Sequence, residues 1–168
     1  MPNINVARTT GGTLFLWNVD SRVGRGGPGI SINNSLVQYL LFRCRLGSEI
    51  DPLLRRDQIT GVWDPRSQSA LKKYEKIAPR VVSDGVIDRM KPGQIAGSIS
   101  NLPYKLTLLN LDFVRSVTGF SPRAAVAGGL ITVDEITDIL MRMPESDDMP
   151  APLSLELKKV RNAGGFSR

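Results

Sequence analysis

The sequence predicts a mainly α-helical chain: a small orthogonal bundle of three helices, a short N-terminal strand or hairpin, and extended N- and C-terminal arms. Three observations predict this class. Apolar residues recur at helical spacing in three segments, capping residues or prolines precede these segments, and glycine-rich or acidic stretches flank them. The 168 residues suffice for one domain with a core, or for a small domain that carries arms.

Residues 1–32 are expected to form an N-terminal arm, a strand and a loop. Residues 1–12 are polar and have no apolar period, so they are assigned to the arm. Thr13 to Val19 is rich in strand-forming residues, and the glycine-rich run 24–29 is incompatible with a helix. We therefore place the start of the helical domain at residue 33.

The first predicted helix begins at Asn33 or Asn34, since either side chain can cap it, and Gly47 supplies the stop. The chain has one cysteine and no histidine, which excludes an internal disulfide and the usual basic partner of a nucleophilic thiol. Cys44 is therefore expected to be structural and buried. The apolar face comprises Leu36, Val37, Leu40, Leu41 and Cys44.

The second predicted helix lies within ITGVWDPRSQSALKKYEKIA, residues 59–78. Gly61 permits a tight turn, Asp64 can cap the helix, and Pro65 suits the first helical position because it has no N–H to leave unpaired. Pro79 ends the helix. The buried stripe is expected to comprise Ala70, Leu71, Tyr74 and Ile77.

The third predicted helix follows a hairpin signal. Asp84-Gly85 stands between two short apolar runs, which is typical of a two-residue hairpin turn. Asn101 and Pro103 then open a helix that ends at Gly119. The three helices can bury one another as an orthogonal bundle over residues 33–119. The apolar face of the third helix comprises Leu106, Leu109, Phe113 and Val117.

Residues 120–168 are predicted to be a short helix followed by an extended C-terminal arm. Thr132 to Glu135 fits a capping box, and the helix it starts is expected to stop at Pro144. The following segment is acidic, proline-containing and weakly apolar, so we expect it to order only against neighbouring chains. The short helix would bury Val133, Ile136, Leu140 and Met143.

Residues 33–78 resemble the small three-helix peptidoglycan-binding domain of wall hydrolases, whose signature runs roughly Asp-Gly-x-Phe/Trp-Gly-Pro-x-Thr-x-x-Ala-Val/Leu-x-x-Phe-Gln. Residues 37–41 are similar to the first helix of that family. The resemblance implies the family fold, and its scaffold positions match better than its polar ones. Matching positions are Gly61, Trp63, Pro65, Ala70, Leu71 and Tyr74, and departures are Thr60, Asp64, Ser67 and Glu75.

The candidate ligand-binding residues for murein are Trp63, Asp64, Arg66 and Gln68. An aromatic face beside hydrogen-bonding groups is what a sugar–peptide polymer requires of a shallow site. Two structural alternatives stay open: Trp63 can instead lock the turn onto the bundle, and Arg66 and Gln68 can belong to a solvated surface.

A looser resemblance points to bacteriophages. The run from Arg22 to Gly29 with the helix after Asn33, and the later Asp84-Gly85-Val86-Ile87, are similar to stretches of peptidoglycan-binding-like proteins encoded by proteobacteria and their phages.

Catalysis is not expected. Without histidine, serine and cysteine triads and ordinary zinc sites lack a necessary residue, and we expect no cofactor and no metal. The run 24–29 lacks the Gly-Lys-Ser/Thr ending of a phosphate-binding loop. Glu49, Asp51 and Asp57 suggest a glycosidase pair only because they are acidic and close in sequence.

Nucleic acid and membrane are not expected as partners. The net charge is +6, but no aromatic stacking residues are interleaved with the basic ones. The start MPNINVARTT has neither a signal-sequence pattern nor a membrane-spanning segment. A basic patch could comprise Arg43, Arg45, Arg55, Arg56, Lys72 and Lys73.

Two functional hypotheses follow. The first is a non-enzymatic phage virion protein of head, neck or tail, assembled in the host cytoplasm, in which the bundle docks onto other virion proteins present in many copies. The alternative is a murein-binding module that attaches a virion or a bacterial surface protein to the cell wall.

Overall fold

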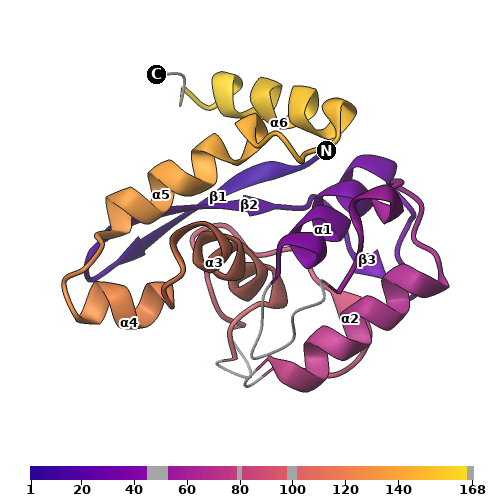
Figure 1. Cartoon of the computed structure of the whole chain (residues 1–168), viewed down its shortest axis with the longest axis horizontal. Coiled ribbons are helices and arrows are strands. Elements are labelled where there is room, and N and C mark those ends of the chain that lie inside the picture. Colours follow the sequence, from indigo (N-terminus) through magenta and orange to yellow (C-terminus); the bar gives the residue numbers. More distant parts are fainter. Residues whose placement is uncertain (45–52, 79–80, 98–101, 166–168) are drawn as a thin grey trace.

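The computed structural model describes residues 1–44, 53–78, 81–97 and 102–165, and this part of the chain is mainly α-helical (Figure 1). Its strands are β1 (Asn3–Thr9), β2 (Gly12–Asn18), β3 (Val23–Gly24) and β4 (Val86–Ile87). Its helices are α1 (Ser31–Arg43), α2 (Pro65–Ile77), α3 (Lys105–Thr118), α4 (Pro122–Ala127), α5 (Val133–Arg142) and α6 (Ala151–Ala163), with short 3-10 helices η1 (Arg56–Gln58) and η2 (Met143–Glu145).

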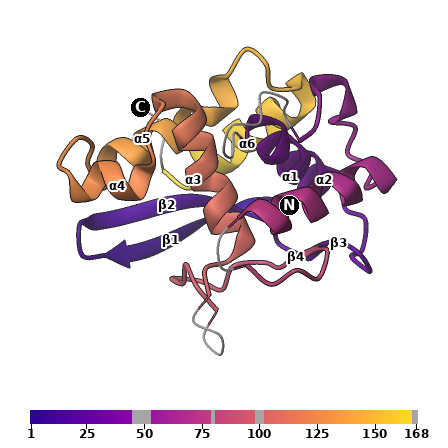
Figure 2. The ribbon, with the colours of Figure 1, turned by 60° about the horizontal axis from the view of Figure 1, so that its bottom comes forward.

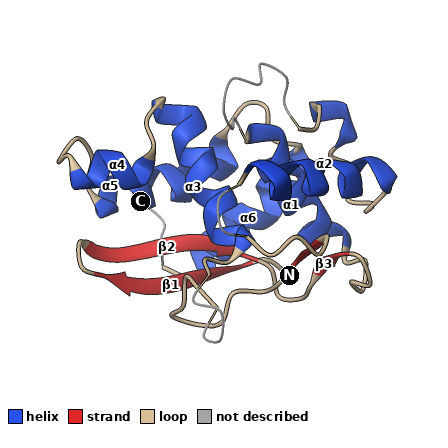
Figure 3. Ribbon diagram, turned by 90° about the horizontal axis from the view of Figure 1, so that it is seen from below, coloured by secondary structure: helices blue, strands red, loops and turns tan. Residues whose placement is uncertain are grey.

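The helices gather on one side of the strands (Figure 3). β1 and β2 form an antiparallel hairpin whose register runs from Asn3 opposite Asn18 to Thr9 opposite Gly12. The predicted strand at 13–19 is thus confirmed, but the N-terminal arm at 1–12 is wrong. Residues 3–9 form a strand although they lack an apolar period, because backbone pairing with β2 orders them.

The buried polar side chain of Asn5 also holds β1 in place, and a hydropathy pattern does not predict this role. Asn5 is buried, and its amide nitrogen donates to the Gln94 carbonyl at 2.8 Å. Its amide oxygen accepts from the Gly93 N–H at 3.0 Å. Because both ends of the amide are paired, Asn5 can lie in the interior at little cost.

β2 is pinned to two helices through Trp17, which is fully buried. The Trp17 indole N–H donates to the Leu140 carbonyl at 2.7 Å. Asn110 of α3 accepts from the Trp17 backbone N–H and donates to its carbonyl, each at 2.9 Å. Asn110 therefore supplies the backbone partner that a third strand would otherwise provide.

α1 begins earlier than predicted. Its N-cap is Ile30, which makes no side-chain capping bond, and the predicted caps Asn33 and Asn34 are buried inside the helix. Their amides serve neighbouring loops instead: Asn33 donates to Asp20 Oδ1 at 2.6 Å and Asn34 donates to the Gly61 carbonyl at 2.9 Å. α1 ends at Arg43 with Cys44 as its C-cap, and the predicted stop at 47 lies outside the described residues.

The predictions for α2, α3 and α5 hold over most of each helix. α3 begins at Lys105 with Tyr104 as its N-cap, later than the predicted start at Asn101 and Pro103, and Asn101 and the predicted stop Pro79 lie outside the described residues. Asp64 caps α2, Gly119 caps α3 at φ +78°, and Thr132 forms the capping box of α5. Ile77 and Val117 were assigned to buried faces but are 38% and 51% exposed. Both lie in the last turn of their helices.

The predicted hairpin at Asp84-Gly85 is wrong. β4 pairs with β3, so that Val23 lies opposite Ile87 and Gly24 opposite Val86. A Cβ on Gly24 would lie 2.5 Å from the Gly85 carbonyl oxygen, and Gly24 has φ +104°. Only glycine allows this backbone approach, which joins segments about sixty residues apart in the sequence.

The predicted C-terminal arm is also wrong, because residues 151–163 form α6. Leu153 and Leu157 are four residues apart and buried, and prolines are tolerated in the first turn of a helix. The preceding turn is held by Asp148, which accepts from Arg43 Nη1 at 2.9 Å and from the Tyr39 hydroxyl at 2.8 Å. α6 packs against η2, α1 and β1, and it lies at the upper edge of the molecule in Figure 1, with Figure 2 giving a second view.

One hydrophobic cluster includes buried residues from all three predicted segments, 1–32, 33–119 and 120–168. The boundaries between these segments stay a prediction. Neighbouring chains were expected because extended N- and C-terminal arms would need a partner to become ordered. The N-terminal strand β1 and the C-terminal helix α6 instead pack on the core of their own chain. No helix in the described ranges has the length and apolar character needed to cross a membrane.

Candidate functional site

The turn between Thr60 and Trp63 is held from below by one buried side chain of α1. Gln38 Oε1 accepts from the N–H groups of Thr60 and Gly61 at 3.1 and 2.9 Å. Gln38 Nε2 donates to the Val62 carbonyl and to Ser67 Oγ, both at 2.8 Å. Because Gln38 pairs with the backbone N–H and carbonyl groups of the turn from the α1 side, the turn is held in one conformation.

Gly61 is required at the centre of this turn. Its φ is +78°, a region that disfavours side chains, and a Cβ would clash with Ser31 Oγ and lie 3.0 Å from Ser35 Oγ. The turn therefore sits directly on the first part of α1. This close approach brings Val62 and Trp63 next to the loop that precedes α1.

Trp63 lies half-buried against the core, and hydrogen bonding fixes its indole N–H. Its indole N–H donates to Gln68 Oε1 at 2.9 Å, and Gln68 Nε2 donates to the Gly85 carbonyl at 3.0 Å. This chain of bonds connects the ring to α2 and to the turn before β4. Trp63 thus locks the turn, as the structural alternative predicted, and still presents part of its ring at the surface.

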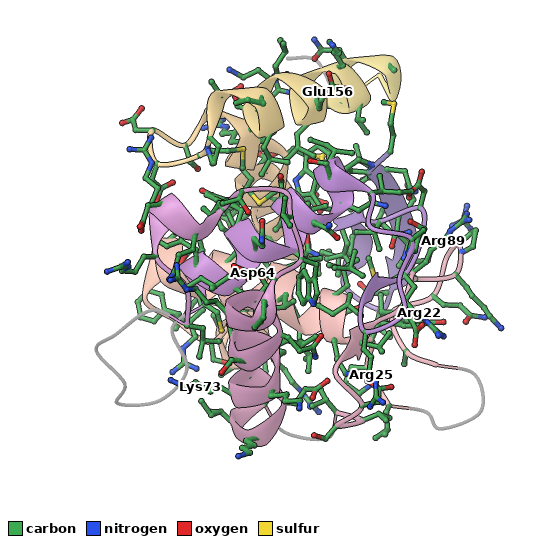
Figure 4. All side chains as sticks on the ribbon, turned by 90° about the vertical axis from the view of Figure 1, so that its right-hand side faces the viewer. Arg22, Arg25, Asp64, Lys73, Arg89 and Glu156 are labelled. Carbon is green, nitrogen blue, oxygen red and sulfur yellow. The ribbon has the colours of Figure 1, made fainter. Side chains whose placement is uncertain are left out.

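The Asp64 carboxylate caps the N-terminus of α2. Its Oδ1 accepts from the Ser67 N–H and from Ser67 Oγ, both at 2.8 Å. The Ser67 backbone hydrogen bond holds the pKa of Asp64 below its usual value. Arg66 is exposed in the first turn of α2. Figure 4 shows Asp64 at the start of α2, with Arg22 and Arg25 on one side of this helix.

A shallow pocket of about 360 Å³ opens between this turn and the glycine-rich loop before α1. Its walls are mostly backbone and small side chains, with the Trp63 ring as the only aromatic lining group of this pocket. The first turn of α1 borders it and has no side-chain cap, which leaves N–H groups for a ligand or solvent. The lining residues are Gly24, Gly27, Gly29, Ser31, Asn34, Gly61, Val62 and Trp63.

The pocket can bind but has no acid–base group of its own. None of its lining residues titrates near neutral pH, so general acid–base catalysis has no candidate in its walls. The described ranges also contain no group of three or more His, Cys, Asp or Glu placed to hold a metal. An aromatic face, amide donors and the Ser31 hydroxyl suit recognition of a neutral or amide-bearing ligand.

Sequence reasoning identified one wall of the pocket and missed the other. Of the four candidate residues, Trp63 lines the pocket, Asp64 and Gln68 are engaged in fixing the turn and the ring, and Arg66 is exposed beside them. The run 24–29 was assigned only as a loop. Its density of glycine was the available signal, because it lets backbone rather than side chains form a wall.

The structure describes only some of the other candidate residues, and Arg45 of the candidate basic patch lies outside the described residues. Asp57 is exposed in η1, whereas Glu49 and Asp51 lie outside the described residues. Within the candidate basic patch, Arg56 Nε donates to the Asp148 carbonyl at 3.0 Å and Arg43 pairs with the carboxylate of the same residue.

A second cluster of titratable groups lies between α1, α2 and α3, where Cys44 and Tyr74 are buried and Asp112 is half-buried. Asp112 Oδ2 accepts from the Tyr74 hydroxyl at 3.0 Å, and the Cys44 thiol lies 3.8 Å away. Burial raises the pKa of Asp112 to about 6, although the Tyr74 hydrogen bond and the Arg115 charge oppose this. Cys44 is 2% exposed, which confirms its buried position.

Replacing Asp112 with asparagine is expected to change the pH dependence of stability. A folded pKa of about 6 gives the wild type stability that is full below the unfolded pKa and is lost as the pH rises through 6. Because asparagine does not ionise and can still accept from Tyr74, the variant should gain roughly 2 kcal/mol on the wild type between pH 4 and 7. Chemical denaturation across this range measures the difference, and a constant difference would contradict the assignment.

Comparisons of the chain with protein-family models, with curated proteins and with solved structures gave no match.

Proposed function

We propose that the protein is a non-enzymatic binding module that holds murein in the pocket beside the Gly61 turn, as a component of a phage particle. One observation carries the proposal: the half-buried Trp63 ring borders a pocket of about 360 Å³ whose remaining wall is largely glycine backbone. Sugar rings stack on aromatic faces, and the acetamido and peptide groups of murein pair with backbone amides and hydroxyls.

We further propose that α1, α2 and α3 form the three-helix unit of peptidoglycan-binding type. α1 contacts both α2 and α3, which such a unit requires. The resembling residues Gly61, Pro65, Ala70 and Tyr74 shape the turn and the α1–α2 packing rather than the pocket walls, apart from Gly61. The additional strands and helices cover faces of this unit.

Retention on purified sacculi tests the proposal. We expect the wild type to sediment with sacculi, and Trp63→Ala to sediment at least about tenfold less, since one aromatic anchor is worth more than 1.4 kcal/mol. Val62→Asp tests the pocket without removing the ring, because Val62 lines it and is 65% exposed.

The matched control is Val82→Asp, the same change at a position that is 50% exposed and lies outside this pocket. It should bind as the wild type does. Absence of wild-type retention, or equal loss with Val62→Asp and Val82→Asp, would contradict murein binding at this pocket. Circular dichroism of each variant separates loss of the site from loss of the fold.

The second candidate is a virion structural or assembly protein that docks onto neighbouring chains. The observation that favours it is an exposed apolar surface around α4, where Val117, Phe120 and Leu130 are each more than half exposed. Surfaces of this kind mark interaction sites more often than isolated exposed residues do. This second candidate rests on the exposed apolar side chains around α4 and not on extended termini.

A further inference from the structure

The outward face of α2 carries basic residues and no acidic one. Four exposed residues of this helix are basic, whereas Glu75, its one acidic residue, is buried. At 3.6 residues per turn the four cations fall within an arc of about 120°, so they share one side of the helix. Lys72 and Lys76 are four residues apart, where like charges repel each other, a cost that folding alone does not require. We call the four residues Arg66, Lys72, Lys73 and Lys76 the α2 basic surface.

The charge of the α2 basic surface is not neutralised by the chain itself. None of its four residues has an ion-pair partner within the described ranges. The acidic side chains that border α2 are engaged elsewhere: Asp64 caps the helix. Glu75 and Asp84 share Lys105. The surface keeps a net positive charge when these acids are counted.

Arg25 adds a further cation beside α2. The Gly85 carbonyl accepts from the Arg25 backbone N–H at 3.2 Å and from Gln68 Nε2 of α2 at 3.0 Å, so the two segments lie next to each other. Figure 4 shows Arg25 on one side of α2 and Lys73 on the other. The positive charge therefore extends across the helix and not only along it.

The two C-terminal helices differ from α2 in their charge. α5 carries three acidic residues and one basic residue. On α6, Lys159 pairs with Glu156 and Arg161 pairs with Glu145. Both helices lie on the opposite side of the molecule from α2 (Figure 1). A polyanion would therefore be drawn to the α2 side of the molecule.

The α2 basic surface suits a partner that is held by charge alone. Protein partners are anchored by apolar or aromatic side chains, and helices that lie in a membrane surface need a broad apolar face. Over the described length of α2, Ile77 is the one large apolar residue that is exposed, and it is 38% exposed at the last position. A nucleic-acid duplex needs no such anchor, because its phosphates line its outer surface at high charge density.

The spacing of the cations agrees with the spacing of phosphates. From Arg66 to Lys76 the helix rises about 15 Å, at 1.5 Å per residue. One strand of duplex DNA carries a phosphate about every 3.4 Å along the axis, so about four phosphates fall within this length. Four cations of α2 therefore face about four phosphates of one strand.

We propose that the α2 basic surface binds the phosphate backbone of duplex DNA without reading its sequence. Contacts to phosphates position a protein on the duplex but carry no sequence information. The expectation that nucleic acid is not a partner rests on missing stacking residues, which single strands require and a duplex backbone does not. The proposal goes beyond murein binding, because none of the four residues lines the pocket beside Gly61.

Fluorescence anisotropy of a short labelled duplex of mixed sequence, titrated with the full chain, tests the proposal. We expect a dissociation constant of about 10⁻⁴ to 10⁻⁶ M at physiological salt. The logarithm of the association constant should fall with the logarithm of the salt concentration with a slope of about −4, because about four phosphates lose their counterions. A duplex of unrelated sequence should bind equally well.

Single and combined substitutions assign the binding to α2. Lys73→Gln should weaken binding and make the salt slope less steep by about 1. The triple variant Lys72→Gln/Lys73→Gln/Lys76→Gln should bind at least about tenfold more weakly. Lys159→Gln is the matched control, because Lys159 is 59% exposed on α6 and already pairs with Glu156. It should leave affinity and slope unchanged.

Four outcomes would overturn the proposal. These are a wild type without salt-dependent binding of the duplex, equal effects of Lys73→Gln and Lys159→Gln, a strong preference for one duplex sequence, and tighter binding to vesicles of anionic lipid than to the duplex. Circular dichroism of each variant separates loss of binding from loss of the fold. Trp63→Ala should keep binding the duplex, so failure of the murein proposal leaves this one standing.

Discussion

Replacing Lys105 with methionine is expected to lower the free energy of unfolding by about 3–5 kcal/mol. Lys105 Nζ donates to Glu75 Oε1 at 2.5 Å and to the Val86 carbonyl at 2.6 Å, and it also pairs with Asp84. The Glu75 side chain is 1% exposed, so the substitution leaves its carboxylate without a countercharge in the interior. Equilibrium denaturation measures the loss.

Two variants control this experiment. Lys159→Met removes the partner of Glu156 from a pair whose lysine is 59% exposed, and it should cost less than about 1 kcal/mol. Lys105→Met combined with Glu75→Gln should recover part of the loss, because the second change removes the stranded charge. A loss for Lys105→Met no larger than that for Lys159→Met would show that the pair is not buried.

Replacing Leu157 with alanine is expected to cost about 2–5 kcal/mol, because α6 is part of the core and not an arm. Leu157 is fully buried and belongs to the same hydrophobic cluster as α1 and β2. The matched control is Leu155→Ala on the same helix, which is 57% exposed and should change stability by less than about 0.5 kcal/mol.

The same pair of variants tests the correction of the C-terminal prediction. In the wild type, α6 should resist limited proteolysis as long as the rest of the chain does. Leu157→Ala should release it first, whereas Leu155→Ala should not. Rapid cleavage within residues 151–163 of the isolated wild type would contradict a packed α6 and support the predicted extended arm.

The elements predicted correctly are those with strong local signals. Asp64-Pro65 defines the start of α2 because the cap and the proline both act within one turn, and the capping box at Thr132 does the same for α5. Gly119 ends α3 for a local reason as well, because its φ is +78°. Such signals need only neighbouring residues.

The elements missed are those that depend on distant partners. β1 is ordered by pairing with β2, and the β3–β4 pair joins segments that lie about sixty residues apart in the sequence. Asn33 and Asn34 have the composition of helix caps, but their amides are taken by Asp20 and Gly61 of other segments. A sequence pattern does not distinguish these uses of asparagine.

The candidate site divides in the same way. Trp63 was predicted from the resemblance and lines the pocket, whereas the polar candidates Asp64 and Gln68 fix the turn and the ring. The role of Gln38 was not predicted, because its three turn partners lie more than twenty residues away. The sequence therefore identified the scaffold of the site better than its ligand-facing groups.

Titration of the isotope-labelled protein with soluble murein fragments, followed by nuclear magnetic resonance, tests the central claim most directly. The chain has two tryptophans, so its spectrum contains two indole N–H signals. Trp63 borders the pocket and Trp17 is fully buried. The account predicts that the Trp63 indole signal and the backbone amides of 24–27, 29–31 and 60–63 shift in a saturable way, while the Trp17 signal does not. Absence of saturable shifts, or shifts confined to other surfaces, would contradict it.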